Sequence, residues 1–345
     1  MNYFKMILKI ICAGGLALAI LSIFVLFYGY TGVHIANPDG ATDYKWEPNQ
    51  LSTTMKEGFA WKRMDENGFN NSCSIDRGRG VDVLLMGSSH MEGANIAVDE
   101  NVGYLLNEML PELHTYNIGV SGHNIYRCVD NLQEAVAVYE PSEYVVLFTT
   151  TIELSVDSMQ AVIDQTAKPI TSYDSGILYF LQKNVPAIKS IYKAIQDWSG
   201  AVISDDDEID GGSSETMKID SQIEASQVQN VKNYETILNQ FLAFAKESTG
   251  TECQLVIVYA PRTEINYEGN IENNVDLEYL RLFSEVCESN EIDFLDLGED
   301  FRELYENRHI LAHGFSNTRA GRGHLNAAGH KAMAECVASY IRGTR

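Results

Sequence analysis

Positive charge is scarce in this chain of 345 residues, which has 25 lysines and arginines against 48 aspartates and glutamates. The formal net charge is −23. A molecule with that field repels nucleic acid, so the composition excludes DNA and RNA as partners. The same charge argues against a body that lies flat on an anionic membrane. It leaves the substrate open.

Cysteine is also sparse and has no pattern that fits a metal. One cysteine lies in the apolar N-terminal segment and the others are scattered, without the paired spacing of zinc or iron–sulfur ligands: Cys12, Cys73, Cys128, Cys253, Cys287 and Cys336. The sequence therefore predicts no metal site. Buried thiols and one or two disulfides both remain open. The acidic run at residues 204–214 lacks the ligand spacing of an EF-hand, so we interpret it as a solvated loop.

Charged side chains are missing from Ile10 to Tyr28. A helix of that length just spans a hydrocarbon core of ~30 Å. Lys5 and Lys9 precede it, and the positive-inside rule then leaves the N-terminus in the cytoplasm and the rest of the chain outside. Two alternatives stay open. Residues 29–33 make a poor cleavage site for a signal peptide, and the segment lacks the polar face of a buried core helix. We therefore predict a cytoplasmic tip and transmembrane anchor over residues 1–30.

The rest of the chain predicts a stalk and one large domain. Residues 31–80 are rich in Asn, Gly and Asp and are interpreted as a stalk and irregular lead-in. Short apolar runs then alternate with amphipathic stretches, which predicts an α/β domain over residues 81–345 with a parallel sheet covered on both faces. The predicted strands are Val81 to Met86, Leu113 to Ile118, Tyr144 to Phe148, Leu255 to Tyr259 and Ile292 to Leu297. Residues 153–228 have no convincing strand and are interpreted as an insertion, which could serve as a lid or cap.

Three short segments at the predicted strand ends carry residues suited to ester chemistry. Ser89 follows the first strand in Gly-Ser-Ser-His, Gly122 follows the second in Ser-Gly-His, and His324 precedes the final helix in Gly-His-Leu-Asn. A serine needs a neighbouring base to become a nucleophile and N–H donors for the oxyanion, and a histidine and a turn glycine supply these. Each segment alone has a plainer interpretation: a helix cap, a turn glycine and a core histidine.

Together the three segments resemble the blocks of the SGNH (GDSL-type) hydrolase family. The resemblance implies a flavodoxin-like three-layer α/β/α sandwich with a parallel five-stranded sheet. It also implies that Ser89 is the nucleophile, Gly122 an oxyanion donor and His324 the base. The family's asparagine after the third strand is missing, and Thr151 is the best-placed substitute. The family's aspartate before the histidine is replaced by Gly321, so the resemblance implies a Ser–His dyad oriented by a backbone carbonyl or by a carboxylate from elsewhere.

Two further residues are candidates for substrate contact. His90 directly follows the proposed nucleophile, although structural support of the turn explains it equally well. Arg262 follows the fourth predicted strand and is suited to an anionic group on a substrate, while a surface ion pair is the commoner role.

The predicted activity is therefore that of an extracytoplasmic serine esterase that needs no cofactor. The resemblance points to O-acyl groups, chiefly acetyl, on cell-wall or exopolysaccharide sugars, with an acylated glycan or another small ester as substrate. The alternatives are a polysaccharide O-acyltransferase with the same dyad and a non-catalytic SGNH-like domain in a polysaccharide-handling assembly. The oligomeric state is left open.

Overall fold

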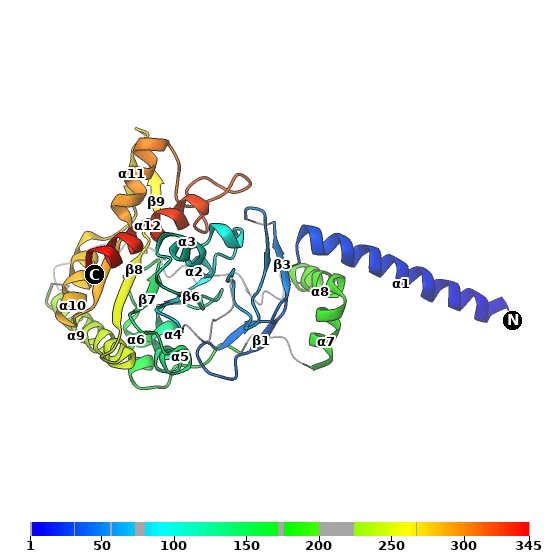
Figure 1. The fold of residues 1–345 in the computed structure, drawn as a ribbon, viewed down its shortest axis with the longest axis horizontal. Coiled ribbons are helices and arrows are strands. Elements are labelled where there is room, and N and C mark those ends of the chain that lie inside the picture. Colours follow the sequence, from blue (N-terminus) through cyan, green and yellow to red (C-terminus); the bar gives the residue numbers. More distant parts are fainter. Residues whose placement is uncertain are drawn as a thin grey trace.

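A computed structural model of the chain describes residues 2–30, 32–55, 57–72, 80–171, 176–199, 224–266 and 268–344. Five strands form one parallel sheet with the order β11-β8-β7-β5-β6. They are β5 (Val83–Met86), β6 (Thr115–Asn117), β7 (Tyr144–Thr149), β8 (Gln254–Tyr259) and β11 (Asp293–Asp296). The chain crosses from β6 over β5 to β7, so the strand order reverses between β5 and β7. The predicted fold class, a three-layer α/β/α arrangement around a five-stranded parallel sheet, is confirmed (Figure 1).

The strands are apolar on both faces because helices cover both faces. Along β5, Val83 and Leu85 face one core and Leu84 and Met86 the other. Packed on the first core are α3 (Val102–Met109), α11 (Gly298–Arg308) and α12 (Ala327–Thr344). Packed on the second are α4 (Ile125–Asp130), α5 (Leu132–Tyr139), α6 (Val156–Ile163), α9 (Glu224–Thr249) and α10 (Leu277–Ser289). The short helix α2 (Ser89–Glu92) follows β5 directly.

The N-terminal part of the body departs from the prediction. Where the sequence predicts a stalk and irregular lead-in, the structure has two antiparallel hairpins packed on the domain. They are β1 (His34–Ala36) with β2 (Tyr44–Trp46), and β3 (Leu51–Thr54) with β4 (Ala60–Arg63). A further hairpin, β9 (Thr263–Ile265) with β10 (Ile271–Asn273), follows β8. The runs in β1 to β4 are too short to give a periodic hydrophobic pattern, so local sequence could not reveal them.

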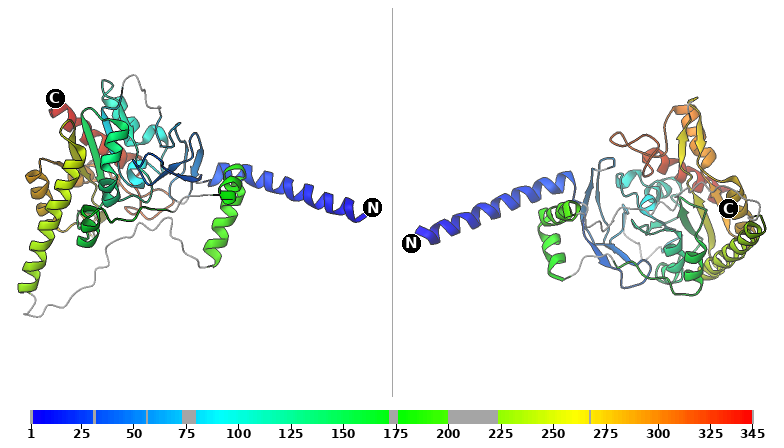
Figure 2. Two further views of the ribbon diagram at one scale, coloured as in Figure 1. Left: turned by 90° about the horizontal axis from the view of Figure 1, so that it is seen from below. Right: turned by 180° about the vertical axis from the view of Figure 1, so that it is seen from behind.

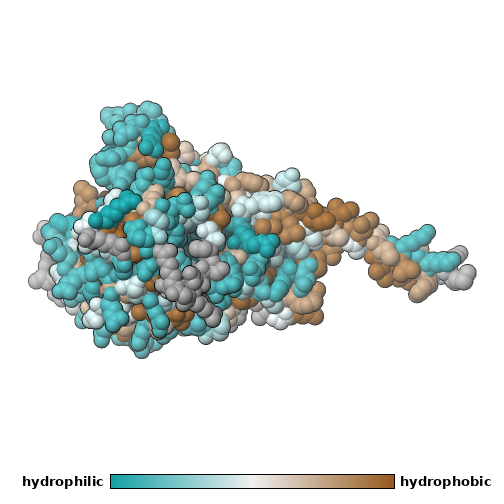
Figure 3. Space-filling model, in the orientation of Figure 1, coloured by the Kyte–Doolittle hydropathy of each residue, from teal (hydrophilic) through white to brown (hydrophobic). Residues whose placement is uncertain are grey.

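The helix α1 (Asn2–Tyr28) projects away from the body (Figures 1 and 2). Residues Tyr3–Tyr28 are long and apolar enough to cross a membrane, and only 11% of the most apolar window is buried against the rest of the protein. Figure 3 shows the hydrophobic surface of this helix against a mostly hydrophilic body.

The predicted insertion at 153–228 is only partly described. Its first helix, α6, packs on the core through Met159 and Val162. Two more helices, α7 (Gly176–Asn184) and α8 (Pro186–Ser199), lie near α1. The acidic run predicted as a solvated loop lies outside the described residues, and a role of the insertion as a lid stays a prediction. Among the described cysteines, Cys12, Cys128, Cys253, Cys287 and Cys336 are free thiols; Cys73 lies outside the described residues.

Candidate active site

Ser89 and His324 meet at the carboxyl end of the sheet. Ser89 is the first residue of α2, immediately beyond β5, and β5 lies at the point where the strand order reverses. Such reversal points are where open α/β sheets form their sites. The Ser89 Oγ lies 2.7 Å from the Nε2 of His324, although 235 positions separate the two residues. The hydroxyl and the ring are therefore within hydrogen-bonding distance.

A carboxylate that no pattern in the sequence predicts completes this contact. Glu57, on the turn between β3 and β4, places its Oε2 2.5 Å from the Nδ1 of His324. Its Oε1 accepts the backbone N–H of His324 at 2.6 Å. A Cβ on Gly323 would lie 1.6 Å from the Glu57 Oε1, and Gly323 has a φ of +91°, so this close approach requires glycine. The expected dyad is thus a Ser–His–Glu arrangement, in which the carboxylate that orients the imidazole comes from elsewhere in the chain.

The turn that carries Glu57 is held on both sides. Asn317 accepts a hydrogen bond from the Gly58 N–H at 2.8 Å and donates one to the Met55 carbonyl at 2.8 Å. Asn95 Nδ2 donates to the Glu57 Oε2 at 3.4 Å. These hydrogen bonds therefore fix the position of the Glu57 carboxylate beside His324.

The electrostatics of Glu57 favour its ionised form. Burial raises the pKa of Glu57, but the hydrogen bonds from His324 and the charge of its ring outweigh burial and hold the pKa below the ordinary value. An ionised carboxylate accepts the Nδ1–H of the imidazole, which leaves Nε2 unprotonated and able to accept the Ser89 O–H.

The lowered pKa of Glu57 predicts a loss of stability in acid. A carboxyl whose pKa is lower in the folded state than in the unfolded state stabilises the fold above the unfolded value of ~4.3, and this contribution is lost as the pH falls through the folded value. We expect the difference in unfolding free energy between the wild type and Glu57→Gln to be largest near pH 7 and to shrink below about pH 4. Urea unfolding across this range measures it; a difference that does not change with pH would contradict the assignment.

The loop after β6 brings Gly122 beside the nucleophile turn. The Val120 N–H donates to the Gly87 carbonyl at 3.0 Å, so the loop continues alongside the end of β5. Gly122 has a φ of +86°, and a Cβ there would lie 2.7 Å from the Tyr44 Oη. Among the residues that the structure describes, neither the Ser89 N–H nor the Gly122 N–H has an acceptor. The N–H of Ser89 and the N–H of Gly122, two residues beyond the contact of Val120 with Gly87, are thus available as donors.

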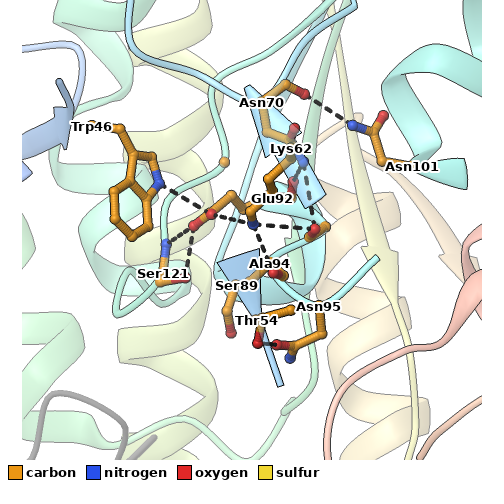
Figure 4. Close-up of polar contacts among 12 residues, drawn as sticks. Trp46, Thr54, Lys62, Asn70, Ser89, Glu92, Ala94, Asn95, Asn101 and Ser121 are labelled. Atoms are coloured by element: carbon orange, nitrogen blue, oxygen red, sulfur yellow. Dashed lines mark hydrogen bonds and ion pairs between the residues drawn. The ribbon is translucent and has the colours of Figure 1, made fainter. Parts of the chain in front are cut away.

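A buried carboxylate links the nucleophile helix to this loop. Glu92, the last residue of α2, accepts the Ser121 N–H at 2.7 Å and the Ser121 Oγ–H at 2.6 Å through its Oε2 (Figure 4). Its Oε1 accepts the Trp46 Nε1–H at 3.1 Å and lies 3.1 Å from the Lys62 Nζ. On the other side of the same peptide, the Tyr44 hydroxyl donates to the Ser121 carbonyl. Three side chains of the N-terminal hairpins therefore reach into the site.

Lys62 and Glu92 form an ion pair that is almost completely buried, with 2% and 0% of their side chains exposed. Burial lowers the pKa of Lys62, and the charge of Glu92 opposes that lowering. The Lys62 ammonium also donates to the Ala94 carbonyl at 2.7 Å. Removal of one partner leaves an uncompensated charge inside the protein.

Lys62→Met is accordingly expected to lower the unfolding free energy by about 3–5 kcal/mol. The matched control is Lys183→Met, which breaks the pair of Lys183 with Glu47; because 42% of the Lys183 side chain is exposed, we expect a loss of at most about 1 kcal/mol. Urea unfolding of the full chain in detergent measures both. Equal losses in the two variants would show that burial does not set the strength of the Lys62–Glu92 pair.

The other predicted site residues lie in different surroundings. Thr151 follows β7 by two residues and is exposed; its backbone is tied to the Thr149 hydroxyl, which donates to the Thr151 carbonyl at 2.7 Å. Its role as an oxyanion donor stays a prediction. His90 is 3% exposed, and its Nδ1 accepts the Leu325 N–H at 3.2 Å, so the structure favours support of the histidine loop over substrate contact. Arg262 is exposed on the segment between β8 and β9, where a substrate contact stays a prediction.

The hydrogen bonds of Asn326 hold the loop that carries His324. Asn326 accepts the N–H groups of Ala328 and Gly329 at 3.0 and 3.2 Å, which caps α12. Its amide donates to the carbonyls of Leu311 and Gly314 at 2.7 and 2.9 Å. The Gly-His-Leu-Asn segment thus holds the histidine at the helix start, as the sequence pattern predicts.

Comparison with protein-family models finds no match, and no curated protein matches the chain. Among solved structures, the chain is similar to a two-domain esterase active on acetylated mannans, with 10% identity over 78% of this chain and 51% of that one and a TM-score of 0.41. It is similar to a member of the lipolytic G-D-S-L family from Veillonella parvula, with 14% identity over 77% of this chain and 100% of that one and a TM-score of 0.38. An acetyl xylan esterase has 18% identity over 75% of this chain and 98% of that one and a TM-score of 0.36.

Proposed function

We propose that this chain is a membrane-tethered serine ester hydrolase that acts outside the cytoplasm on O-acyl groups, chiefly acetyl, of cell-wall or exopolysaccharide sugars. The observation that carries the catalytic part is the series of contacts from Ser89 Oγ to His324 Nε2 and from His324 Nδ1 to Glu57. The apolar helix α1 supports the tether, with Lys5 and Lys9 placing its N-terminal end in the cytoplasm. The choice of glycan acyl groups comes from the resemblance described above.

The proposed mechanism is acyl transfer to water in two steps. Ser89 Oγ attacks the ester carbonyl while His324 Nε2 takes the hydroxyl proton, and the same proton passes to the leaving alcohol as the C–O bond breaks. Water, deprotonated by His324, then attacks the acyl-serine; the bond from the acyl carbon to Ser89 Oγ breaks, His324 returns the proton to Ser89, and the acid is released. Glu57 holds the imidazole in one tautomer and stabilises its charged form. The N–H groups of Ser89 and Gly122 bind the oxyanion in each step.

The buried Glu92 and the hydroxyl of Tyr44 position one of these donors. The Ser121 carbonyl and the Gly122 N–H belong to the same planar peptide group, so fixing the carbonyl fixes the direction of the N–H. Tyr44 donates to that carbonyl, while Glu92 holds the N–H and hydroxyl of Ser121. The hydrogen bond to the carbonyl also polarises the peptide and strengthens its N–H as a donor.

Tyr44→Phe is therefore expected to lower kcat by about tenfold, less than the 100- to 1000-fold effect of losing a whole oxyanion donor, and to leave KM unchanged. The matched control is Tyr116→Phe, which removes another buried hydroxyl, one that donates to Asp65 at 2.5 Å away from the loop. The control is expected to reduce stability and spare kcat. Steady-state kinetics of both variants measure this, and equal kcat values in the two would refute the positioning role.

The proposed function is tested by release of acetate. The purified chain is expected to hydrolyse p-nitrophenyl acetate and to remove acetyl groups from an O-acetylated glycan without an acceptor present. A parallel reaction with an unacetylated acceptor glycan tests the transferase alternative: acetyl transfer that replaces hydrolysis would overturn the hydrolase assignment. A folded protein that releases no acetate in any of these reactions would favour the non-catalytic alternative.

A further inference from the structure

A helical hairpin lies against the end of α1 where that helix enters the body. The hairpin consists of α7 and α8, and the Ala187 N–H at the start of α8 donates to the Ser22 Oγ of α1 at 3.3 Å. On the body side, the Tyr179 hydroxyl of α7 donates to Glu47 at 2.5 Å. Two views show α7 running across the direction of α1 (Figures 1 and 2). If α1 stands across a bilayer, α7 therefore lies along its surface.

The hairpin exposes large apolar side chains on both helices. On α7, Ile177 is 80% exposed and Phe180 62%, and with Leu181 they follow the spacing of one helix face. On α8, Ile195 is 56% exposed, and Ile191 and Tyr192 are exposed beside it. Apolar surface of this kind on a helix marks an interaction site. Figure 3 shows hydrophobic surface along α1 and again at its base, where the hairpin lies.

The charge of the hairpin is opposite to that of the chain. Residues 176–199 contain three lysines and one aspartate, a net charge of +2, whereas the whole chain carries −23. Helices that lie in a membrane interface combine an apolar face with lysines, which attract anionic headgroups. Lys183 pairs with Glu47 of the body, so the hairpin weakens locally the repulsion between this acidic protein and an anionic membrane.

The contacts on α1 place the hairpin at the depth of the interface. The uncharged residues Ile10–Tyr28 extend over about 28 Å as a helix, close to the ~30 Å of a hydrocarbon core, so the helix reaches the outer boundary of that core at its last turn. Its last two turns, about 11 Å, therefore cover the depth to which interfacial helices insert their apolar face. Ser22 contacts the hairpin in those turns, and the Trp61 Nε1–H donates to the Phe27 carbonyl at 3.3 Å about 7.5 Å further along. Trp61 is 42% exposed, and tryptophan is enriched in membrane proteins at the interface between membrane and water.

We propose that α7 and α8 form an interfacial membrane-binding hairpin, with its apolar face at the boundary between headgroups and acyl chains of the outer leaflet. Together with α1 it attaches the body to the bilayer at two places and so fixes the orientation of the body. The inference rests on the tethering part of the proposed function and is independent of catalysis.

The test uses the full chain in vesicles of phosphatidylglycerol and phosphatidylcholine, with the phosphatidylcholine acyl chains brominated to quench tryptophan. Phe180→Trp and Ile195→Trp place probes on the two helices, and Leu277→Trp, at a residue 74% exposed on α10, is the matched control. Because these side chains are exposed, the substitutions are expected to leave stability within about 0.5 kcal/mol. The emission added by the first two probes, measured against the wild type, is expected to lose intensity with brominated lipid, and that of Trp at 277 to keep it.

Three results would overturn the inference. Probes at 180 and 195 that resist quenching as the probe at 277 does would show that the hairpin stays in water. Blue-shifted emission without quenching would show that protein, such as a second copy, covers the apolar face. A chain that does not float with the vesicles at all would overturn the tether and this inference together, and acetate release would still report separately on catalysis.

Discussion

Replacing Ser89 by alanine is expected to reduce kcat for ester hydrolysis by about 10⁴- to 10⁶-fold, the range found when the nucleophile of a triad is removed. The hydroxyl is the only group of Ser89 that the substitution removes, and it lies 2.7 Å from the His324 ring. The backbone N–H at position 89 stays in place, so a small residual rate from oxyanion binding remains. Steady-state hydrolysis of p-nitrophenyl acetate measures the effect.

The neighbouring serine provides the control for this substitution. The Ser88 side chain accepts the His90 N–H at 3.4 Å and caps α2. Ser88→Ala is expected to cost about 1 kcal/mol of stability and to leave kcat within a few-fold of the wild type. If Ser88→Ala abolishes activity and Ser89→Ala retains it, the nucleophile has been assigned to the wrong serine.

Replacing Glu57 by glutamine is expected to lower kcat by about 10⁴-fold, although the side chain keeps its size. The amide cannot carry the negative charge that stabilises the imidazolium, and its NH₂ group favours the tautomer in which Nδ1 is unprotonated. His324 Nε2 would then carry the proton and could no longer accept the Ser89 O–H. The loss should appear in kcat, since the nucleophile remains in place.

The control carboxylate is Glu264, which pairs with Arg322 at 2.9 Å two residues before His324. Both side chains of that pair are more than half exposed. Glu264→Gln is therefore expected to change kcat little. Activity in Glu57→Gln that equals activity in Glu264→Gln would leave a Ser–His dyad as the better description.

The sheet was predictable because burial on both faces gives each strand an apolar run. All five strands were predicted to within two residues at each end, and the motif around Asn326 revealed the histidine loop. Ser89, Gly122 and His324 follow strands or precede a helix, so the topology of a parallel sheet brings them to one edge. Ser89 therefore lies beside His324 because of strands and a helix that the sequence pattern predicts.

Glu57 could not be predicted for a physical reason. It lies 267 positions from His324, on a turn between two short strands, and it is one of 48 acidic residues. What distinguishes it is a set of long-range contacts, such as those of Asn317 and Gly323, that no local pattern encodes. The same holds for Lys62 and Glu92, whose pairing depends on how the β3–β4 hairpin packs against α2. The part of the chain interpreted as a stalk therefore supplies the carboxylate beside His324 and contacts the loop of Ser121 and Gly122.

Covalent labelling identifies the nucleophile. The full chain is treated with a serine-directed fluorophosphonate, and the modified peptide is identified by mass spectrometry. We expect a single adduct on Ser89, formed in the wild type and in Ser88→Ala, slowed strongly in Glu57→Gln and absent from Ser89→Ala. A folded wild type that forms no adduct, or an adduct that persists in Ser89→Ala, would contradict this expectation.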